Sequence, residues 1–295
     1  MRVRSRLGAG FVGASVALFA AACTGASSEG RVNVVAAIYP LAWAAQQVGG
    51  DRVDVEDLTP PGVEAHDATL TAAQRADIQT ADVVVYLGRI DFQPDVERAV
   101  DDAGGKVIDV TAELGNRPRT GETFDPHLWL DPADMQEIVR QVADALVTTD
   151  PSRADGYADR AEAALGALED LDATFRAGLA GCAFTTFVVT HEAFGYLAGA
   201  YGLRQLGIEG LAPESEPSAA RIQAAAQAID QGRAAPVVFY EETEAGRRVG
   251  RSVAADAGVP ALPLNALESD PAPLDYVSVM EENLTNLREG LRCRA

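Results

Sequence analysis

The sequence predicts an α/β fold of two lobes, each with a central, mostly parallel sheet flanked by helices, joined by a long linking helix. Three observations predict this fold. Strand-like apolar runs alternate with helical segments up to about residue 110, the same alternation returns after residue 180, and no strand signal lies between about 132 and 179. Strands that alternate with helices at this spacing form βαβ units and hence parallel sheets. A chain of 295 residues is long enough for two such lobes.

The first lobe is expected to span residues 31–131. Its opening run, Val32–Ile38, is apolar throughout, which is typical of a buried strand. Pro40 suits the first position of the helix that follows. Thr71 and Gln74 have the spacing of a capping box, which predicts the start of another helix. Further strands are expected at 54–58, 82–88 and 106–110, with a loop over 59–68.

Residues 132–180 are expected to form a helical region. The stretch 132–150 is amphipathic, and Pro151 then begins a run rich in Ala, Leu and Glu that continues to Leu179 with apolar residues at helical period. An ordinary surface helix would show the same pattern. The length of the run indicates instead a strut that links the two lobes.

The second lobe is expected to span residues 181–295. Strands are expected at 184–191, 204–211, 235–242 and 260–265, and helices at 192–202, 216–232 and 246–258. Ser218 lies near the start of the second of these helices.

The first 22 residues are expected to be a signal peptide. Arg2, Arg4 and Arg6 precede an apolar stretch that is too short to span a bilayer comfortably. The stretch ends in small residues followed by Cys23, which resembles a lipobox, the bacterial site at which the cysteine becomes the lipidated first residue. A plain secretory signal with an incidental cysteine is the alternative. Residues 23–30 then read as a tether, so the protein is expected outside the cytoplasm, anchored to the cell membrane through this lipid alone.

The net charge limits the classes of partner molecule, and the cysteine content predicts a disulfide. The formal net charge is −20, which argues against nucleic acid and anionic lipid as direct partners and suits metal cations. Cys182 and Cys293 remain after the leader is removed, and an even pair in an exported protein predicts a disulfide between them. Two unpaired, buried thiols are the alternative.

The chain has only three histidines, and all three lie in loops near the ends of expected strands. They are His66, His127 and His191. Ligands bind beyond the carboxyl ends of the strands in open parallel sheets, so one cleft between the lobes could gather all three. A single histidine is more often a surface or hydrogen-bonded residue. Three imidazoles and one oxygen ligand, however, form a tetrahedral zinc site.

One histidine lies in the rigid segment "FDPHLWLDP". Asp125 and Asp131 flank His127 there, and each is a candidate to accept the second ring N–H of a histidine and so fix its orientation. Asp131 with Pro132 equally suits the start of a helix.

Four segments carry a family resemblance that runs from about Val32 to the C-terminus. They cover residues 60–88, 125–132, 188–222 and 237–265, with "DPHLWLDP" and "THEAFGYLA" as the most specific motifs. The chain resembles the cluster A-I solute-binding lipoproteins of bacterial zinc/manganese ABC importers, and its three histidines resemble those of the zinc-type members. The resemblance implies a monomeric binding protein rather than an enzyme, with an ABC permease as partner. It also implies that His66, His127 and His191 hold the metal between the lobes.

The fourth ligand is where the sequence departs from the family. Members usually place an Asp after a late strand, and here "PLNALES" offers Asn265. Glu241 matches another acidic position of the family and is the next candidate, although an exposed acid at a helix start is the simpler interpretation. Glu242, Asp67, Glu64 and a water molecule are further candidates.

Ligand type favours Zn(II) over Mn(II). Three imidazole nitrogens with a neutral fourth ligand form a soft site without negative charge, whereas manganese prefers carboxylates. Mn(II) or another divalent metal is the alternative cargo. A secreted zinc hydrolase is an alternative from another class, but His191 and Glu192 are not followed by the second histidine of an H-E-x-x-H motif. A surface adhesin is a third possibility.

Overall fold

The computed structural model describes residues 30–63, 65–88, 93–114, 124–211 and 218–294 of the chain. The predicted signal peptide, the tether with Cys23, and Glu64 lie outside the described residues. Residues 31–295 form one compact unit. No helix within the described ranges combines the length and apolar composition needed to cross a membrane.

The first sheet has four parallel strands in the order β2-β1-β3-β4. Val34 of the central strand pairs with Val55 on one side and Val83 on the other, and Val83, Val84 and Val85 are fully buried. Central strands without a polar face are typical of parallel sheets that helices cover on both sides. The strands are β1 (Val32–Ala36), β2 (Val53–Asp57), β3 (Val83–Tyr86) and β4 (Lys106–Asp109), and the helices are α1 (Tyr39–Gly49), α2 (Ala72–Thr80), α3 (Pro94–Ala99) and α4 (Val110–Leu114).

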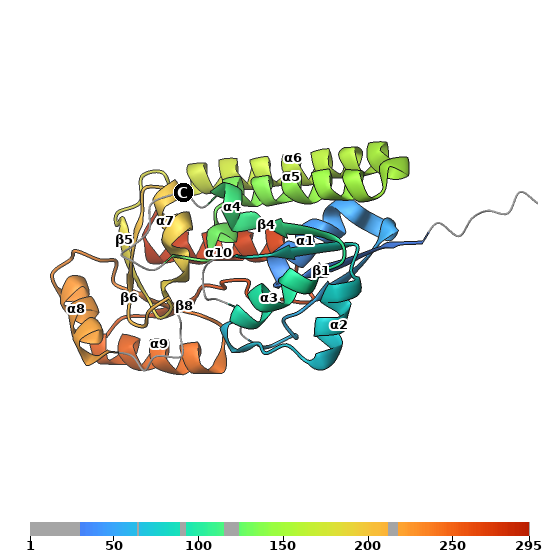
Figure 1. Cartoon of the computed structure of the whole chain (residues 1–295). Helices are drawn as coiled ribbons and strands as arrows, with labels where there is room; N and C mark the ends of the chain where they lie inside the picture. The colour runs from blue at the N-terminus through green and yellow to red at the C-terminus, as the bar shows by residue number, and fades with distance from the viewer. Residues whose placement is uncertain (1–29, 64, 89–92, 115–123, 212–217, 295) are drawn as a thin grey trace, which may run out of the picture. The chain divides into compact units, whose positions relative to one another are not determined.

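The second sheet repeats this topology, again with four parallel strands, in the order β6-β5-β7-β8. Figure 1 shows it together with α7 to α10. The strands are β5 (Thr186–Val189), β6 (Arg204–Gly207), β7 (Val238–Tyr240) and β8 (Ala261–Pro263), and the helices are α7 (Gly195–Ala200), α8 (Ala219–Asp230), α9 (Glu244–Ala257) and α10 (Tyr276–Gly290). Helix α10 was not anticipated from the sequence.

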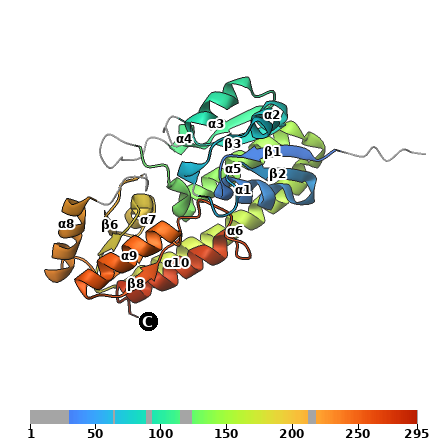
Figure 2. The same cartoon turned by 90° about the horizontal axis from the view of Figure 1, so that it is seen from below.

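Two helices without an intervening strand connect the sheets, as the sequence predicts. They are α5 (Pro132–Thr149) and the 26-residue α6 (Ala154–Leu179). Helix α6 packs along α5 and contacts α1 of the first lobe and α10 of the second, which Figure 2 shows from below. Near its start, Arg160 donates a hydrogen bond of 2.7 Å to the carbonyl of Val48 in α1. Near its end, Gly178 approaches Leu284 so closely that an added Cβ would lie 3.1 Å from that side chain.

Two predictions from the sequence, a capping box and a disulfide, are found in the structure. Thr71 and Gln74 form the predicted capping box at the start of α2. Cys182 and Cys293, 111 positions apart, are joined in a disulfide that ties the end of the chain to the segment before β5.

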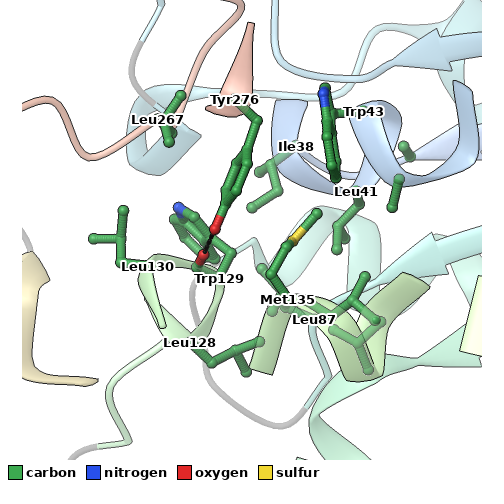
Figure 3. Close-up of a cluster of buried hydrophobic side chains, with 14 of the residues drawn as sticks. Ile38, Leu41, Trp43, Leu87, Leu128, Trp129, Leu130, Met135, Leu267 and Tyr276 are labelled. Carbon is green, nitrogen blue, oxygen red and sulfur yellow. Dashed lines mark hydrogen bonds between the residues drawn. The ribbon is translucent and has the colours of Figure 1, made fainter. Parts of the chain in front are cut away.

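A buried aromatic cluster holds the segment after His127 in place (Figure 3). The Trp129 ring nitrogen donates a hydrogen bond of 2.7 Å to the carbonyl of Ala266, and the Tyr276 hydroxyl donates one of 2.6 Å to the carbonyl of Trp129. Trp129 and Tyr276 are both fully buried. These bonds fix the 127–131 segment against the turn that follows β8 and against the start of α10.

Candidate metal centre

The three histidines lie in short irregular segments beside strand or helix ends. His66 lies in the 3-10 turn η2 (Ala65–Asp67), which follows β2. His127 immediately precedes the turn η4 (Leu128–Leu130) that leads into α5, and His191 immediately precedes η6 (Glu192–Phe194), just after β5. None of the three lies within an α-helix or a strand.

The structure brings all three rings together. The ring centroids of His66 and His127 are 5.8 Å apart, those of His66 and His191 5.5 Å, and those of His127 and His191 4.8 Å. Glu268 completes the group, and one donor atom from each of the four residues lies within 4.8 Å of the others. All four side chains are at least nine-tenths buried.

Glu268 lies at the centre of the cluster. Its Oε1 atom is 3.0 Å from Nε2 of His127, 3.5 Å from Nε2 of His66 and 3.8 Å from Nδ1 of His191. Among the described residues no donor hydrogen-bonds its other oxygen, Oε2, which is buried. A buried carboxylate oxygen without a donor is a free acceptor, and a cation would satisfy it.

Glu268 is not among the ligands expected from the sequence, and the turn after β8 explains why. Asn265, one of the candidates for the fourth ligand, lies in this turn, where its Oδ1 accepts a hydrogen bond of 2.7 Å from the Leu267 backbone N–H. Leu267 adopts a left-handed conformation with φ of 59°, which is uncommon for a leucine. Together these features carry the chain around so that the next side chain, Glu268, points at the histidines. The available signal was that Glu268 is the first acid after this late strand.

The hydrogen bonds of His191 define its protonation. Its Nδ1 lies 2.9 Å from Oε2 of Glu241, and its Nε2 lies 3.0 Å from the carbonyl oxygen of Leu211. Both partners are acceptors, so both ring nitrogens carry protons in this arrangement. Burial lowers the pKa of His191, but the charges of Glu241 and Glu268 outweigh it and raise this pKa to about 10.

His127 and Glu268 are shifted in opposite directions. Burial lowers the pKa of His127, but hydrogen bonds from the ring to Asp125 and Glu268 outweigh it, so the pKa is raised. Burial raises the pKa of Glu268, yet the hydrogen bonds from His127 and His66 and the charge of His191 bring it well below its usual value. The centre therefore pairs the ionised carboxylate of Glu268 with the protonated ring of His191.

The two aspartates that flank His127 have different contacts. Asp125 Oδ1 lies 2.8 Å from Nδ1 of His127 and accepts a second hydrogen bond of 3.0 Å from the backbone N–H of the same residue. Asp131 instead accepts a hydrogen bond of 2.9 Å from the backbone N–H of Ala133 and caps α5, with Pro132 in the first turn. The structure therefore shows Asp131 at a helix start.

Two of the remaining acidic candidates, Glu241 and Glu242, line the approach to the centre, whereas the side chain of Asp67 lies outside the described part of the structure. A cavity of about 530 Å³ is lined by Glu241, Glu242, Asn265 and Glu268, among others. Glu241 is buried beside His191, so it is not the exposed helix-start acid of the simpler interpretation, whereas Glu242 is exposed. The cavity thus gives a polar, acidic route to the Glu268 carboxylate.

Comparison with known proteins identifies a family. The model of the family described as zinc-uptake complex component A, periplasmic (ZnuA), matches residues 34–290. The high-affinity zinc uptake system protein ZnuA of Bacillus subtilis is 30% identical over 311 aligned positions, which cover 95% of this chain and 96% of that protein.

A second relative is longer than this chain. The zinc-binding lipoprotein AdcA of Streptococcus pneumoniae is 32% identical over 295 aligned positions, which cover 92% of this chain and 58% of that protein. The chain therefore spans a little over half the length of AdcA. The Zn(II)-bound ZnuA-like domain of the same AdcA superposes with a TM-score of 0.76 at 34% identity, covering 89% of this chain and 99% of that domain.

Proposed function

The chain belongs to the zinc-uptake complex component A (ZnuA) family, and from this premise we propose that it captures Zn(II) outside the cytoplasm and delivers it to an ABC importer. One observation carries the proposal. Three imidazoles and one carboxylate from four separate segments converge so that their donor atoms lie within 4.8 Å of one another.

We propose His66, His127, His191 and Glu268 as the ligands. Three histidine nitrogens and one carboxylate oxygen satisfy the tetrahedral preference of zinc. The hydrogen bonds that now join Glu268 to the histidines would be exchanged for bonds to the ion. Each ring would give up the proton on its metal-binding nitrogen and keep the N–H on the other nitrogen. Asn265 or water would be a neutral fourth ligand. Glu268, which we propose in their place, supplies one negative charge.

The donor set favours zinc over manganese. Imidazole suits Zn(II), Cu(II) and Ni(II), whereas Mn(II) prefers oxygen ligands. Asp125 and Glu241 support the site by hydrogen-bonding the rings of His127 and His191 at 2.8 and 2.9 Å. Such partners orient a ligating imidazole and raise its basicity.

A hydrolytic function is disfavoured by the same four residues. Catalytic zinc sites use three protein ligands and keep one position for water or substrate. Four side chains that converge on one point leave no such position. We therefore propose a binding protein that performs no chemistry.

The placement in the cell follows from the N-terminal sequence. We propose that residues 1–22 are removed, that lipidated Cys23 anchors the protein to the outer face of the cell membrane, and that it acts as a monomer with a permease partner. We also propose lobe boundaries at residues 31–131 and 181–295, with 132–180 as the linking region.

A competition titration tests the proposed cargo. The protein should take up one Zn(II) per chain from a chromophoric chelator, and His127→Ala should lower the zinc affinity by orders of magnitude while circular dichroism stays unchanged. Expression of the wild type should restore growth in zinc-poor medium to a bacterium that lacks its own zinc-uptake binding protein. Zinc affinity equal in the wild type and His127→Ala would overturn the proposal.

A further inference from the structure

A second cavity, separate from the cavity at the metal centre, lies at the carboxyl end of β2. It has a volume of about 310 Å³. Its walls include Tyr39 and Trp43 of α1, Asp57 at the end of β2, and Asp270 from the turn after β8. Nothing in the proposed zinc chemistry uses these four side chains.

Two side chains that line this cavity, Asp57 and Trp43, each have a buried polar atom without a partner among the described residues. Oδ1 of Asp57 accepts a hydrogen bond of 2.9 Å from the Thr59 backbone N–H, whereas the buried Oδ2 has no partner in the described part of the chain. The ring nitrogen of Trp43 likewise has none, although the side chain is only 6% exposed. Buried polar groups are nearly always hydrogen-bonded, so these side chains leave one acceptor and one donor that a bound molecule can satisfy.

The rest of the Trp43 side chain is held firmly. Its ring packs against Tyr276 with centroids 4.9 Å apart. Figure 3 shows the Trp43 nitrogen on the side of the ring away from Trp129 and Met135. The N–H group therefore points out of the aromatic cluster and is not available to it.

The cavity has two acidic side chains, Asp57 and Asp270, and its negative charge is greatest above pH 7. Burial raises the pKa of Asp57 to about 7, and the nearby charge of Asp270 adds to this shift. No lysine or arginine is found among the described residues that line the cavity. A positively charged occupant would therefore relieve both the burial of the Asp57 carboxylate and its repulsion by Asp270.

We propose that this cavity binds an arginine side chain of a partner protein. The guanidinium lies between Asp57 and Asp270, and the neighbouring peptide carbonyl of the partner accepts a hydrogen bond from the Trp43 N–H. A guanidinium supplies five N–H donors in a plane and matches two carboxylates better than an ammonium does. A peptide also brings the carbonyl acceptor that an isolated cation lacks. The chain's net charge of −20 favours a basic partner surface.

The cavity lies beside two segments that carry proposed zinc ligands. Asp57 begins the segment that leads to His66, and Asp270 follows Glu268 by two residues. A partner's arginine at this point would touch both segments.

Nuclear magnetic resonance of the tryptophan side chains tests the proposal without metal. The chain has two tryptophans, so the indole N–H signal of Trp43 is assigned by its loss in Trp43→Phe. Titration with Nα-acetyl-arginine methylamide at pH 8 should shift the Trp43 signal saturably and leave the Trp129 signal in place. Methylguanidinium, which has no carbonyl, should bind more weakly, and the neutral Nα-acetyl-citrulline methylamide should not bind.

Two matched variants decide the assignment. Asp57→Asn should weaken the binding of the arginine probe at least tenfold. Asp54→Asn removes an exposed charge on the same strand, one that pairs with Arg31 at 2.6 Å, and should leave the binding unchanged. The absence of a saturable shift, equal binding of the citrulline probe, or equal binding by Asp57→Asn and the wild type would each overturn the proposal.

Discussion

Oε1 of Glu268 lies 3.0 Å from Nε2 of His127, although 141 positions separate the two residues. Glu268 is placed by the turn after β8 of the second sheet, and His127 by the segment between β4 and α5. The candidate metal centre therefore depends on the packing of both halves of the chain, because each half contributes two of its four side chains.

Glu268→Gln should weaken zinc binding by about 100-fold or more, because it replaces a charged, central oxygen ligand with a neutral one. Competition with a chelator of known affinity measures the change. The control is Glu242→Gln, which removes an exposed acid from the same cavity and should alter affinity by no more than about threefold. Similar losses in the two variants would show that only the general charge of the cavity matters.

Asp125→Asn should weaken zinc binding by about 10- to 100-fold, the usual effect of removing a carboxylate that orients a ligating histidine. The wild-type carboxylate accepts from both the ring and the backbone N–H of His127. Asp131→Asn is a suitable comparison, because Asp131 caps α5 and Asn is also a good capping residue. Isothermal titration of both variants would contradict this account if Asp131→Asn lost more affinity than Asp125→Asn.

Zinc binding should release at least one proton per ion at pH 8. His191 has its pKa raised to about 10, so it carries a proton at this pH that the metal must displace. Affinity should consequently rise with pH up to about 10, since fewer protons then compete with the ion. Calorimetry in buffers of different ionisation enthalpy counts the released protons, and a binding enthalpy independent of the buffer would contradict this prediction.

Replacing both disulfide cysteines with serine should lower stability without changing zinc affinity. The bond closes a loop of 111 positions, for which the chain-entropy relation gives about 5 kcal/mol. Cys182 precedes β5, whereas His191 follows it, so the bond and the ligand lie at opposite ends of this strand. Thermal unfolding should shift down by roughly 10 °C or more. An unchanged transition, or a matching loss of zinc affinity, would count against this division of roles.

The sheets and the three histidines were predictable because their signals are local or topological. The buried strands are short apolar runs, and the histidines lie in segments next to the ends of regular elements, where open parallel sheets bind ligands. The sequence also carries signals for helix α10, although this helix was not anticipated. Asp275 caps it, and apolar residues recur at helical spacing on its buried face: Tyr276, Val279, Met280 and Leu287.

Glu268 was not predictable by the same means. Its role depends on the left-handed conformation of Leu267 and on the side chain of Asn265, which accepts the Leu267 N–H within the turn. No propensity scale assigns that geometry to leucine. Tertiary packing sets the direction in which a side chain of an irregular turn points, and a sequence pattern does not predict this direction.

The most direct test of the zinc-binding account is a crystal structure with zinc, collected on both sides of the zinc absorption edge. The account predicts one anomalous peak per chain, about 2.0 to 2.1 Å from a ring nitrogen of His66, His127 and His191 and about 2.0 to 2.2 Å from an oxygen of Glu268. A peak elsewhere, or a coordination shell that excludes Glu268, would contradict it.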